Sequence, residues 1–311
     1  MNYSDRTEVF FNDQISNWDL ASNNYRQLEN VRTRSVDFDG FEVLIQFNPG
    51  RITSTAAKVD SKSIETRPCF LCGKNRPAQQ KGLVFKPGMT VLVNPFPIFK
   101  KHLTIVSEDH VNQRISGNFG TMLDLAAELT DYQVFYNGPQ CGASAPDHFH
   151  FQAGNKGFLP VEKDFEGKRH CRLLSAKPGA EVWFWPGYSR TIFSLKGDNR
   201  DELIKAFNAF YNKFSEIQND KPEPMLNILA SYSSGYWVIH IFPRKVHRPA
   251  QFFAEGDSKI LLSPASVDLG GVVITPREED YRKIKREDLD DIFRQVSLDN
   301  SDLLPLIEDI L

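Results

Sequence analysis

The chain has 311 residues, of which 41% are hydrophobic and 25% are charged, and its formal net charge is −3. This length suits one large domain or two similar halves with a buried core, and the slight negative charge argues against a nucleic-acid binder, which usually carries a basic excess. No apolar run approaches the roughly 20 residues of a membrane span, and the polar start MNYSDRTE is unlike a signal peptide, so we expect a cytoplasmic protein.

The first half of the chain predicts strands interrupted by one helix. Its polar start, up to about residue 30, is expected to be helical or loosely ordered. Residues 41–51, FEVLIQFNPGR, alternate like a strand and end at a Pro-Gly turn. Residues 90–110 predict a strand, a proline-rich loop and a second strand, and residues 120–136 predict a helix that gives way to a strand near Gln133.

The second half has the same texture. Residues 180–197 predict a hairpin, residues 199–217 an amphipathic helix, and MLNILASYS, YWVIHIFPR and GGVVITPR three further strands. A polar helical segment is expected from Glu278 onward. Strand, helix and strand in each half predict an α+β fold of two antiparallel sheet units. Because the seam falls within residues 156–171, we expect domains at residues 1–165 and 166–311.

The stretch DHFHFQAG, residues 147–154, is the most informative one. In a strand, alternate side chains share a face, so His148, His150 and Gln152 would point one way and the two phenylalanines into the core. The simpler interpretation is a half-buried strand whose histidines make ordinary hydrogen bonds. The preceding loop, NGPQCGASAP, favours a ligand site, because its small residues can expose backbone N–H groups to phosphate oxygens.

A second candidate site lies at Cys69 and Cys72. They belong to the chain's four cysteines, with Cys141 and Cys171. Disulfides are unusual in a protein that is not secreted, so a two-residue gap indicates a metal-binding or redox pair. The alternative is two free thiols in a turn.

GASAPDHFHFQ resembles the His-x-His-x-Gln signature of the transferase and phosphorylase branch of the histidine-triad superfamily. This branch includes galactose-1-phosphate uridylyltransferases, diadenosine tetraphosphate phosphorylases and GDP-hexose phosphorylases. Residues 45–51 are similar to its phosphate-contacting strand, and residues 69–75 to the zinc-binding start of the uridylyltransferases. Residues 150–163 and 270–281 resemble the GDP-hexose phosphorylases, and residues 226–244 resemble the diadenosine phosphorylases. The resemblance implies two histidine-triad-like halves, each an antiparallel sheet packed with helices.

The resemblance also implies roles for the motif. His150 would be the nucleophile that attacks the α-phosphorus of a nucleotide and forms a covalent nucleotidyl-histidine. Gln152 would donate a hydrogen bond to a non-bridging phosphate oxygen. The hydrolases of the superfamily carry a third histidine at this position. Glutamine can act neither as an acid nor as a base, so transfer to phosphate or a sugar phosphate is expected in place of hydrolysis.

Further residues are expected to contact phosphate or to bind a metal. The resemblance assigns phosphate contacts to Arg51, Asn137, Ser144 and Lys163, and a structural Zn²⁺ held by Cys69, Cys72, His110 and His148. Such a metal would orient the strand that carries His150; the alternative is that His110 is a surface histidine. A basic cluster at Lys100, Lys101 and His102 fits a solvated patch and a phosphate site equally well. For His240 and Arg244, the alternatives are a structural role and a place in a cleft.

The residues leave several reactions open. We favour cleavage of a GDP-hexose, with a hexose-1-phosphate uridylyltransferase and a dinucleoside polyphosphate phosphorylase as alternatives. Asp147 separates Pro146 from His148 and departs from the Pro-His-x-His spacing of the uridylyltransferases, which bears on base specificity. A non-catalytic nucleotide-binding module is the alternative of another class, and the intact His150 and Gln152 argue against it. Expected partners are the nucleotide substrate, the phosphate or sugar phosphate acceptor and, since relatives are often dimers, a second copy of the chain.

Overall fold

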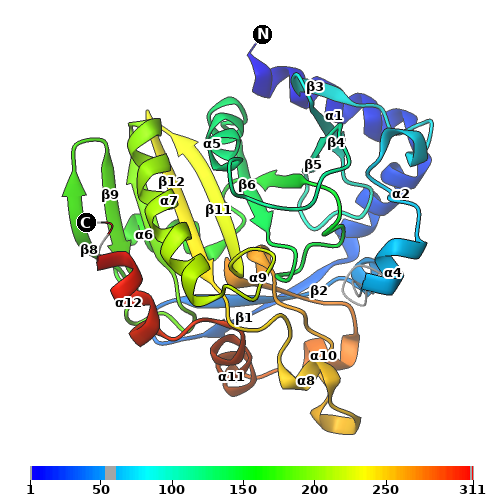
Figure 1. Ribbon diagram of the computed structural model, residues 1–311. Coiled ribbons are helices and arrows are strands. Elements are labelled where there is room, and N and C mark those ends of the chain that lie inside the picture. The colour runs from blue at the N-terminus through cyan, green and yellow to red at the C-terminus, as the bar shows by residue number, and fades with distance from the viewer. Residues whose placement is uncertain (1, 53–60, 309, 311) are drawn as a thin grey trace.

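The computed structural model describes residues 2–52, 61–308 and 310. A ten-stranded antiparallel sheet forms its centre (Figure 1). The strands are β3 (Leu83–Lys86), β4 (Met89–Val93), β5 (His102–Ser107), β6 (Tyr132–Asn137), β7 (His150–Asn155), β8 (Arg172–Lys177), β9 (Ala180–Phe184), β10 (Phe193–Gly197), β11 (Leu226–Ser233) and β12 (Tyr236–Pro243). Their order across the sheet is β3-β4-β5-β7-β6-β11-β12-β10-β9-β8.

This order consists of the same five-strand arrangement used twice. In each half, three strands follow one another, a helix comes next, and the last two strands exchange places. The two units meet where β6 pairs with β11, with Asn137 opposite Asn227. The predicted α+β fold of two antiparallel units is therefore confirmed, and the units join into one continuous sheet. The domain boundary near residue 165 stays a prediction.

Two amphipathic helices cover one face of the sheet, α5 (Phe119–Glu128) and α7 (Arg200–Ile217) (Figure 1). The helix α7 begins after Asn199, whose side chain accepts hydrogen bonds from the backbone N–H groups of Asp201 and Glu202 and so caps the helix. The rings of Phe119 and Phe207 stack with their centroids 3.9 Å apart and tie the helices together. Each such buried ring contributes about 1.5–3 kcal/mol through the hydrophobic effect.

The opposite face carries a small second sheet of β1 (Arg32–Asp37), β2 (Glu42–Phe47) and β13 (Val272–Thr275), in the order β1-β2-β13. The strand β2, predicted from its alternation, buries Val43 and Ile45 completely. It pairs in parallel with β13, which lies more than 220 residues later in the chain. This pairing joins the beginning of the first half to the end of the second.

The remaining helices surround these two sheets. They are α1 (Tyr3–Asn17), α2 (Asp19–Gln27), α4 (Ser61–Thr66), α6 (Pro160–Gly167), α8 (Ala250–Phe253), α9 (Ser266–Leu269), α10 (Glu278–Lys283), α11 (Arg286–Val296) and α12 (Asn300–Glu308). Within the described ranges, no helix combines the length and the apolar character that crossing a bilayer requires.

Most predicted elements are confirmed, including the helical start, the β9–β10 hairpin and the C-terminal helices. One detail of the motif differs. The strand β7 begins at His150, and His148 lies in the preceding turn. The side chains of His150 and Gln152 therefore share one face of β7, as expected. His148 precedes the strand, so its side chain does not have to point to that face. Phe149 and Phe151 pack into the core beneath α5 and α7, as predicted.

Candidate active site

A cavity of about 780 Å³ opens on the sheet face opposite α5 and α7. Such a volume lies within the usual range of small-molecule sites, about 300–1,000 Å³. The cavity is lined by residues of both halves of the chain and includes five predicted site residues: His150, Gln152, Arg51, Asn137 and Ser144. Lys163 does not line it and lies on an exposed part of α6, so the structure does not bring this lysine together with the others.

His150 is buried and held in one protonation state. Its Nδ1 lies 2.8 Å from the backbone carbonyl oxygen of His148. A carbonyl oxygen can only accept, so Nδ1 carries the proton and Nε2 keeps its lone pair. Burial is the main cause that lowers the pKa of His150, to about 4, and the ring is therefore neutral at pH 7. Among the described residues, none makes a hydrogen bond to Nε2, and the side chain lines the cavity.

Gln113, which the sequence did not single out, fixes the backbone of His150. Its Oε1 accepts from the backbone N–H of His150 at 2.8 Å, and its Nε2 donates to the carbonyl oxygens of His150 and Asn137 at 2.9 and 3.0 Å. This buried amide thus links the first residue of β7 to the end of β6. A lone glutamine in a polar loop has no sequence signal that would reveal this role.

Asn137 and Arg51 offer hydrogen-bond donors to the cavity. The Oδ1 of Asn137 accepts from the backbone N–H of Ser266 at 2.9 Å and from Asn227 at 2.7 Å, which leaves the Nδ2 group for a ligand. Arg51 donates to the carbonyl oxygen of Phe96 at 2.7 Å. Burial lowers the pKa of Arg51 to about 10, so its guanidinium stays charged at neutral pH.

Arg67 is a cavity residue that the sequence did not reveal. Its Nη2 donates to the carbonyl oxygen of Ser144 at 3.2 Å and to Oδ1 of Asp147 at 3.0 Å. Asp147 is the residue that departs from the uridylyltransferase spacing, and here it anchors an arginine at the cavity wall. The arginine lies two positions before Cys69, which is the one signal that could have marked it.

Asp268 gives the cavity a carboxylate. Both of its oxygens accept backbone N–H groups, Oδ1 from Ile274 and Oδ2 from Ala265, each at 2.9 Å. Burial raises the pKa of Asp268 to about 6, and the charge of Arg51 opposes that rise. The positive charge of the cavity wall is therefore partly balanced near α9.

The three basic residues at positions 100–102 have different surroundings, since the two lysines lie at the surface and the histidine is buried beside Gln152. Lys100 is exposed, and Lys101 forms an ion pair with Glu8. His102 is fully buried and contacts Oε1 of Gln152 through its Nε2 at 3.0 Å. The interpretation as a solvated patch thus fits the two lysines but is wrong for the histidine.

His240 and Arg244, for which the sequence allowed either a structural role or a place in a cleft, are structural. Arg244 is completely buried and donates to backbone carbonyl oxygens, including that of Pro264 at 2.9 Å. The Nδ1 of His240 lies 2.8 Å from the hydroxyl oxygen of Ser194, which also accepts from the indole N–H of Trp185 at 2.9 Å. Neither residue lines the cavity.

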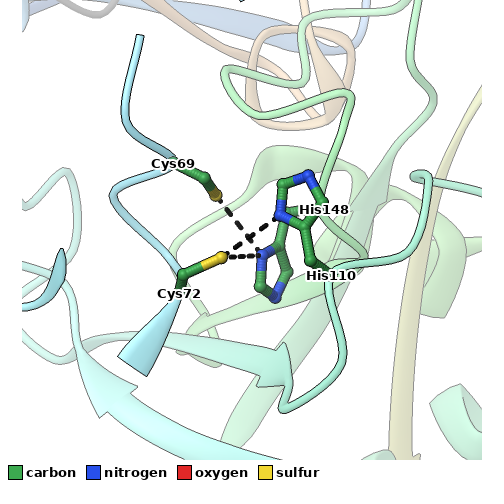
Figure 2. A group of neighbouring side chains, drawn as sticks. All are labelled: Cys69, Cys72, His110 and His148. Carbon is green, nitrogen blue, oxygen red and sulfur yellow. Dashed lines mark hydrogen bonds between the residues drawn. The ribbon is translucent and has the colours of Figure 1, made fainter. Parts of the chain in front are cut away.

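The expected metal ligands come together in one cluster, shown in Figure 2. The Sγ of Cys69 lies 3.3 Å from Nδ1 of His148, and the Sγ of Cys72 lies 3.2 Å from Nδ1 of His110 and 3.5 Å from Nδ1 of His148. In a tetrahedral zinc site the bond lengths separate sulfur and nitrogen by roughly 3.6 Å. The cluster therefore has the donor set and the spacing of a Cys2His2 metal site.

The tautomer of His148 also fits a metal. Its Nε2 lies 2.7 Å from the carbonyl oxygen of Ser107 and must donate to it, so the lone pair is on Nδ1, the atom that faces the thiols. The Oδ2 of Asp147 lies 3.6 Å from Nε2 of His110, which is too far for a hydrogen bond that would fix the tautomer of that ring. The residues present thus suit a divalent metal ion bound by two thiolates and two neutral imidazoles.

Two family models match the chain, one in each half. Residues 10–155 match a family described as a domain of unknown function (DUF4922), and residues 165–311 match one described as the GDPGP1-like, C-terminal domain.

Curated relatives include two galactose-1-phosphate uridylyltransferases. The one from Staphylococcus saprophyticus is 29% identical over 132 residues, which cover 41% of this chain and 25% of the relative. The one from Halalkalibacterium halodurans is 27% identical over 164 residues, which cover 46% and 31%. The chain therefore matches only about a quarter to a third of the length of these relatives.

Solved structures share the fold over almost the whole chain. Yeast Ap4A phosphorylase Apa2 in complex with Ap4A has a TM-score of 0.58 at 16% identity, covering 93% of this chain and 97% of that one. The same enzyme in complex with AMP has a TM-score of 0.59 at 16% identity, covering 91% and 96%. Identities this low establish the fold alone.

The GDPGP1-like family model, the matched galactose-1-phosphate uridylyltransferases and the fold shared with Ap4A phosphorylase all support the resemblance to this branch of the histidine-triad superfamily. The second half of the chain, residues 165–311, carries the match to the GDPGP1-like, C-terminal domain. The resemblance inferred from the motifs is confirmed.

Proposed function

We propose that the protein is a nucleotidyltransferase of the phosphorylase type, which cleaves a nucleoside-diphosphate sugar, with a GDP-hexose preferred, through a covalent intermediate on His150. One observation carries this proposal. His150 is neutral, its Nδ1–H is bound to the carbonyl oxygen of His148, and its side chain lines the cavity of about 780 Å³.

In the first step, the Nε2 lone pair of His150 attacks the α-phosphorus and forms an N–P bond. The bond from the α-phosphorus to the bridging oxygen breaks, and that oxygen takes its electron pair and leaves on the sugar 1-phosphate. In the second step, an oxygen of inorganic phosphate or of a sugar phosphate attacks the same phosphorus. The N–P bond then breaks, and its electron pair returns to Nε2 of the neutral imidazole.

Charge that builds on the phosphoryl oxygens needs donors that are already in place. Arg51, Arg67 and the Nδ2 group of Asn137 supply them from separate parts of the cavity wall. Gln152 supplies a fourth donor, two residues beyond the nucleophile and on the same face of β7. Since an amide cannot take a proton from water, the intermediate persists until a phosphate acceptor arrives.

The cysteine and histidine cluster is proposed to hold a structural Zn²⁺. With Cys69, Cys72, His110 and His148 as its four ligands, the ion would have no position left for substrate, so it would supply rigidity and no chemistry on the nucleotide. Such an ion would hold the chain at His148, whose carbonyl oxygen accepts the hydrogen bond from the ring of His150.

The match to the GDPGP1-like domain supports the preference for a GDP-hexose. A second candidate is phosphorolysis of a dinucleoside polyphosphate, because the fold of the Ap4A phosphorylase covers 93% of this chain. A third is uridylyl transfer, because the matched curated relatives are galactose-1-phosphate uridylyltransferases.

A substrate panel tests the proposal. The protein is incubated with GDP-glucose, UDP-glucose, ADP-glucose or diadenosine tetraphosphate, with and without inorganic phosphate, and the released nucleotides are separated. We expect phosphate-dependent release of a nucleoside diphosphate, fastest from GDP-glucose, and at least a 10³-fold loss in His150→Asn. A non-catalytic binding module would instead raise its melting temperature with a nucleotide yet release nothing, which would refute the enzymatic proposal.

A further inference from the structure

The amide of Gln152 lies at the end of a chain of hydrogen bonds that runs from the loop between β4 and β5. We infer that His102 is a positioning residue, which fixes the Gln152 side chain so that its NH₂ group faces the cavity. The inference rests on the proposed function for its catalytic consequence. The tautomer of His102 and the orientation of Gln152 can be tested on the free protein, without a substrate.

The backbone sets the tautomer of His102. The N–H of Ile98 donates to Nδ1 of His102 at 3.2 Å, so Nδ1 must be an acceptor. A neutral imidazole has one proton, which is therefore on Nε2. That atom lies 3.0 Å from Oε1 of Gln152 and donates to it. The backbone N–H of Ile98 thus fixes the tautomer of His102, and this tautomer fixes the orientation of the Gln152 amide.

Asn94 gives the same orientation by an independent route. The backbone N–H of Phe96 donates to Oδ1 of Asn94 at 2.9 Å, which turns the Nδ2 group toward the strand. This group donates to the hydroxyl oxygen of Thr104 at 3.0 Å and stands 3.5 Å from Oε1 of Gln152. Two N–H donors therefore converge on one oxygen of the Gln152 amide.

A flipped amide would be unfavourable on both sides. Its NH₂ group would face the N–H donors of His102 and Asn94 and be repelled by them, and its oxygen would be repelled by the phosphate oxygens. In the observed orientation the acceptor is used inside the protein, and two donor hydrogens remain for the cavity. A donor that is fixed before the reaction costs no reorientation when charge develops.

His102 is well suited to remain in place. It is fully buried, and burial lowers its pKa to about 3, with the charge of Arg51 acting in the same direction, so the ring stays neutral. The hydroxyl of Tyr25 donates to the carbonyl oxygen of His102 at 2.9 Å and accepts from its backbone N–H at 3.2 Å. The ring of Phe99 packs edge-on against the imidazole at 5.4 Å. The helix α2 thereby supports the site from outside the cavity.

The structural part of the inference is tested without a substrate. Long-range ¹H–¹⁵N spectra of the whole ¹⁵N-histidine-labelled protein, assigned with His102→Gln, report which ring nitrogen carries the proton. We expect the Nε2–H form for His102 and the Nδ1–H form for His150, unchanged between pH 6 and 8. An Nδ1–H or a doubly protonated His102 would overturn the inference and leave the proposed function untouched.

The functional part is tested by a double-mutant cycle. The probe is whichever of GDP-glucose, UDP-glucose and diadenosine tetraphosphate turns over in the wild type. We expect His102→Leu to lower kcat 10- to 100-fold with KM changed less than 3-fold. The same change made in a Gln152→Leu background should cost less than 3-fold, because the group that His102 positions is then absent. A merely structural role would instead give equal losses in both backgrounds and would overturn the inference.

Two further variants make the result specific. His102→Gln keeps an N–H donor of similar reach and is expected to recover at least 5-fold of the activity that His102→Leu loses. His240→Leu removes an equally buried histidine outside the cavity and is expected to change kcat less than 3-fold. If His102→Leu does not fold, the tautomer spectra and His102→Gln decide. If the wild type turns over no probe, the proposed function fails and the spectra alone decide the inference.

Discussion

His148 and His150 are joined by one hydrogen bond of 2.8 Å, from the ring Nδ1 of His150 to the backbone carbonyl oxygen of His148. The side chain of His148 belongs to the cysteine and histidine cluster, and its backbone holds the proposed nucleophile. The short segment from His148 to His150 therefore connects the proposed metal site to the nucleophile.

The first prediction concerns this metal. The protein should contain about one zinc ion per chain, and Cys69→Ser should reduce zinc below 0.3 per chain and lower the melting temperature, because a structural zinc contributes directly to folding. Elemental analysis and thermal unfolding measure both. Cys171→Ser, which changes a cysteine outside the cluster, serves as the matched control. Equal zinc content in the wild type and Cys69→Ser would contradict the assignment.

The second prediction concerns the charge at position 152. Gln152→Glu has nearly the same shape, and its carboxylate can still accept from His102 and Asn94. It replaces a donor with a negative charge where phosphate should lie, so kcat should fall about 10²–10³-fold, the usual cost of losing such a donor. Steady-state kinetics with the substrate found in the panel measure this loss. An active Gln152→Glu enzyme would show that position 152 does not face the phosphate.

The third prediction concerns Gly154 in β7. A Cβ atom at this position would lie 2.3–2.4 Å from ring atoms of Phe99, which packs on the bare backbone. Gly154→Ala should therefore displace the ring and lower the free energy of unfolding by about 1–3 kcal/mol. Urea unfolding measures it, with Gly187→Ala as the control, since a Cβ there meets no atom within 4 Å. Similar stability of both variants would contradict the packing described.

The fourth prediction concerns Glu223, whose Oε2 accepts from the backbone N–H of Ile115 at 2.8 Å and whose Oε1 accepts from the hydroxyl of Tyr136. Burial raises its pKa from 4.5 to about 7. Between these values the folded protein binds more protons than the unfolded chain. Its contribution to stability is therefore complete below pH 4.5 and is lost as the pH rises through 7.

Glu223→Gln removes this titration. Its stability relative to the wild type should therefore improve by about 1–3 kcal/mol between pH 5 and pH 8. Urea unfolding of both proteins across this range measures the difference, which cancels pH effects from all other groups. A difference independent of pH would show that Glu223 does not titrate as described.

The sequence predicted those parts of the molecule that depend on local pattern. Alternation and helical spacing located most strands and helices, and the motif brought His150 and Gln152 onto one face. The pairing of β2 with β13 depends on a contact between residues more than 220 positions apart, and no local pattern carries it. The strand β8 was missed because it is largely exposed and lacks a clear alternation.

The site shows the same division. Cys69, Cys72, His110 and His148 could be grouped from the resemblance, because their types and order match known metal sites. Lys163 was misplaced, because a matching stretch does not tell on which face of a helix a side chain lies. Arg67, Gln113 and His102 make hydrogen bonds to atoms that are distant in the sequence, and such bonds leave no trace in composition or spacing.

Intact-protein mass spectrometry tests the central claim most directly. The wild type is mixed with GDP-glucose, UDP-glucose or diadenosine tetraphosphate in the absence of phosphate, and the adduct is mapped by peptide sequencing. The account predicts one added nucleoside monophosphate on His150, labile in acid, absent from His150→Asn and discharged when phosphate is added. Phosphate-dependent turnover without any adduct on His150, or an adduct on another residue, would contradict it.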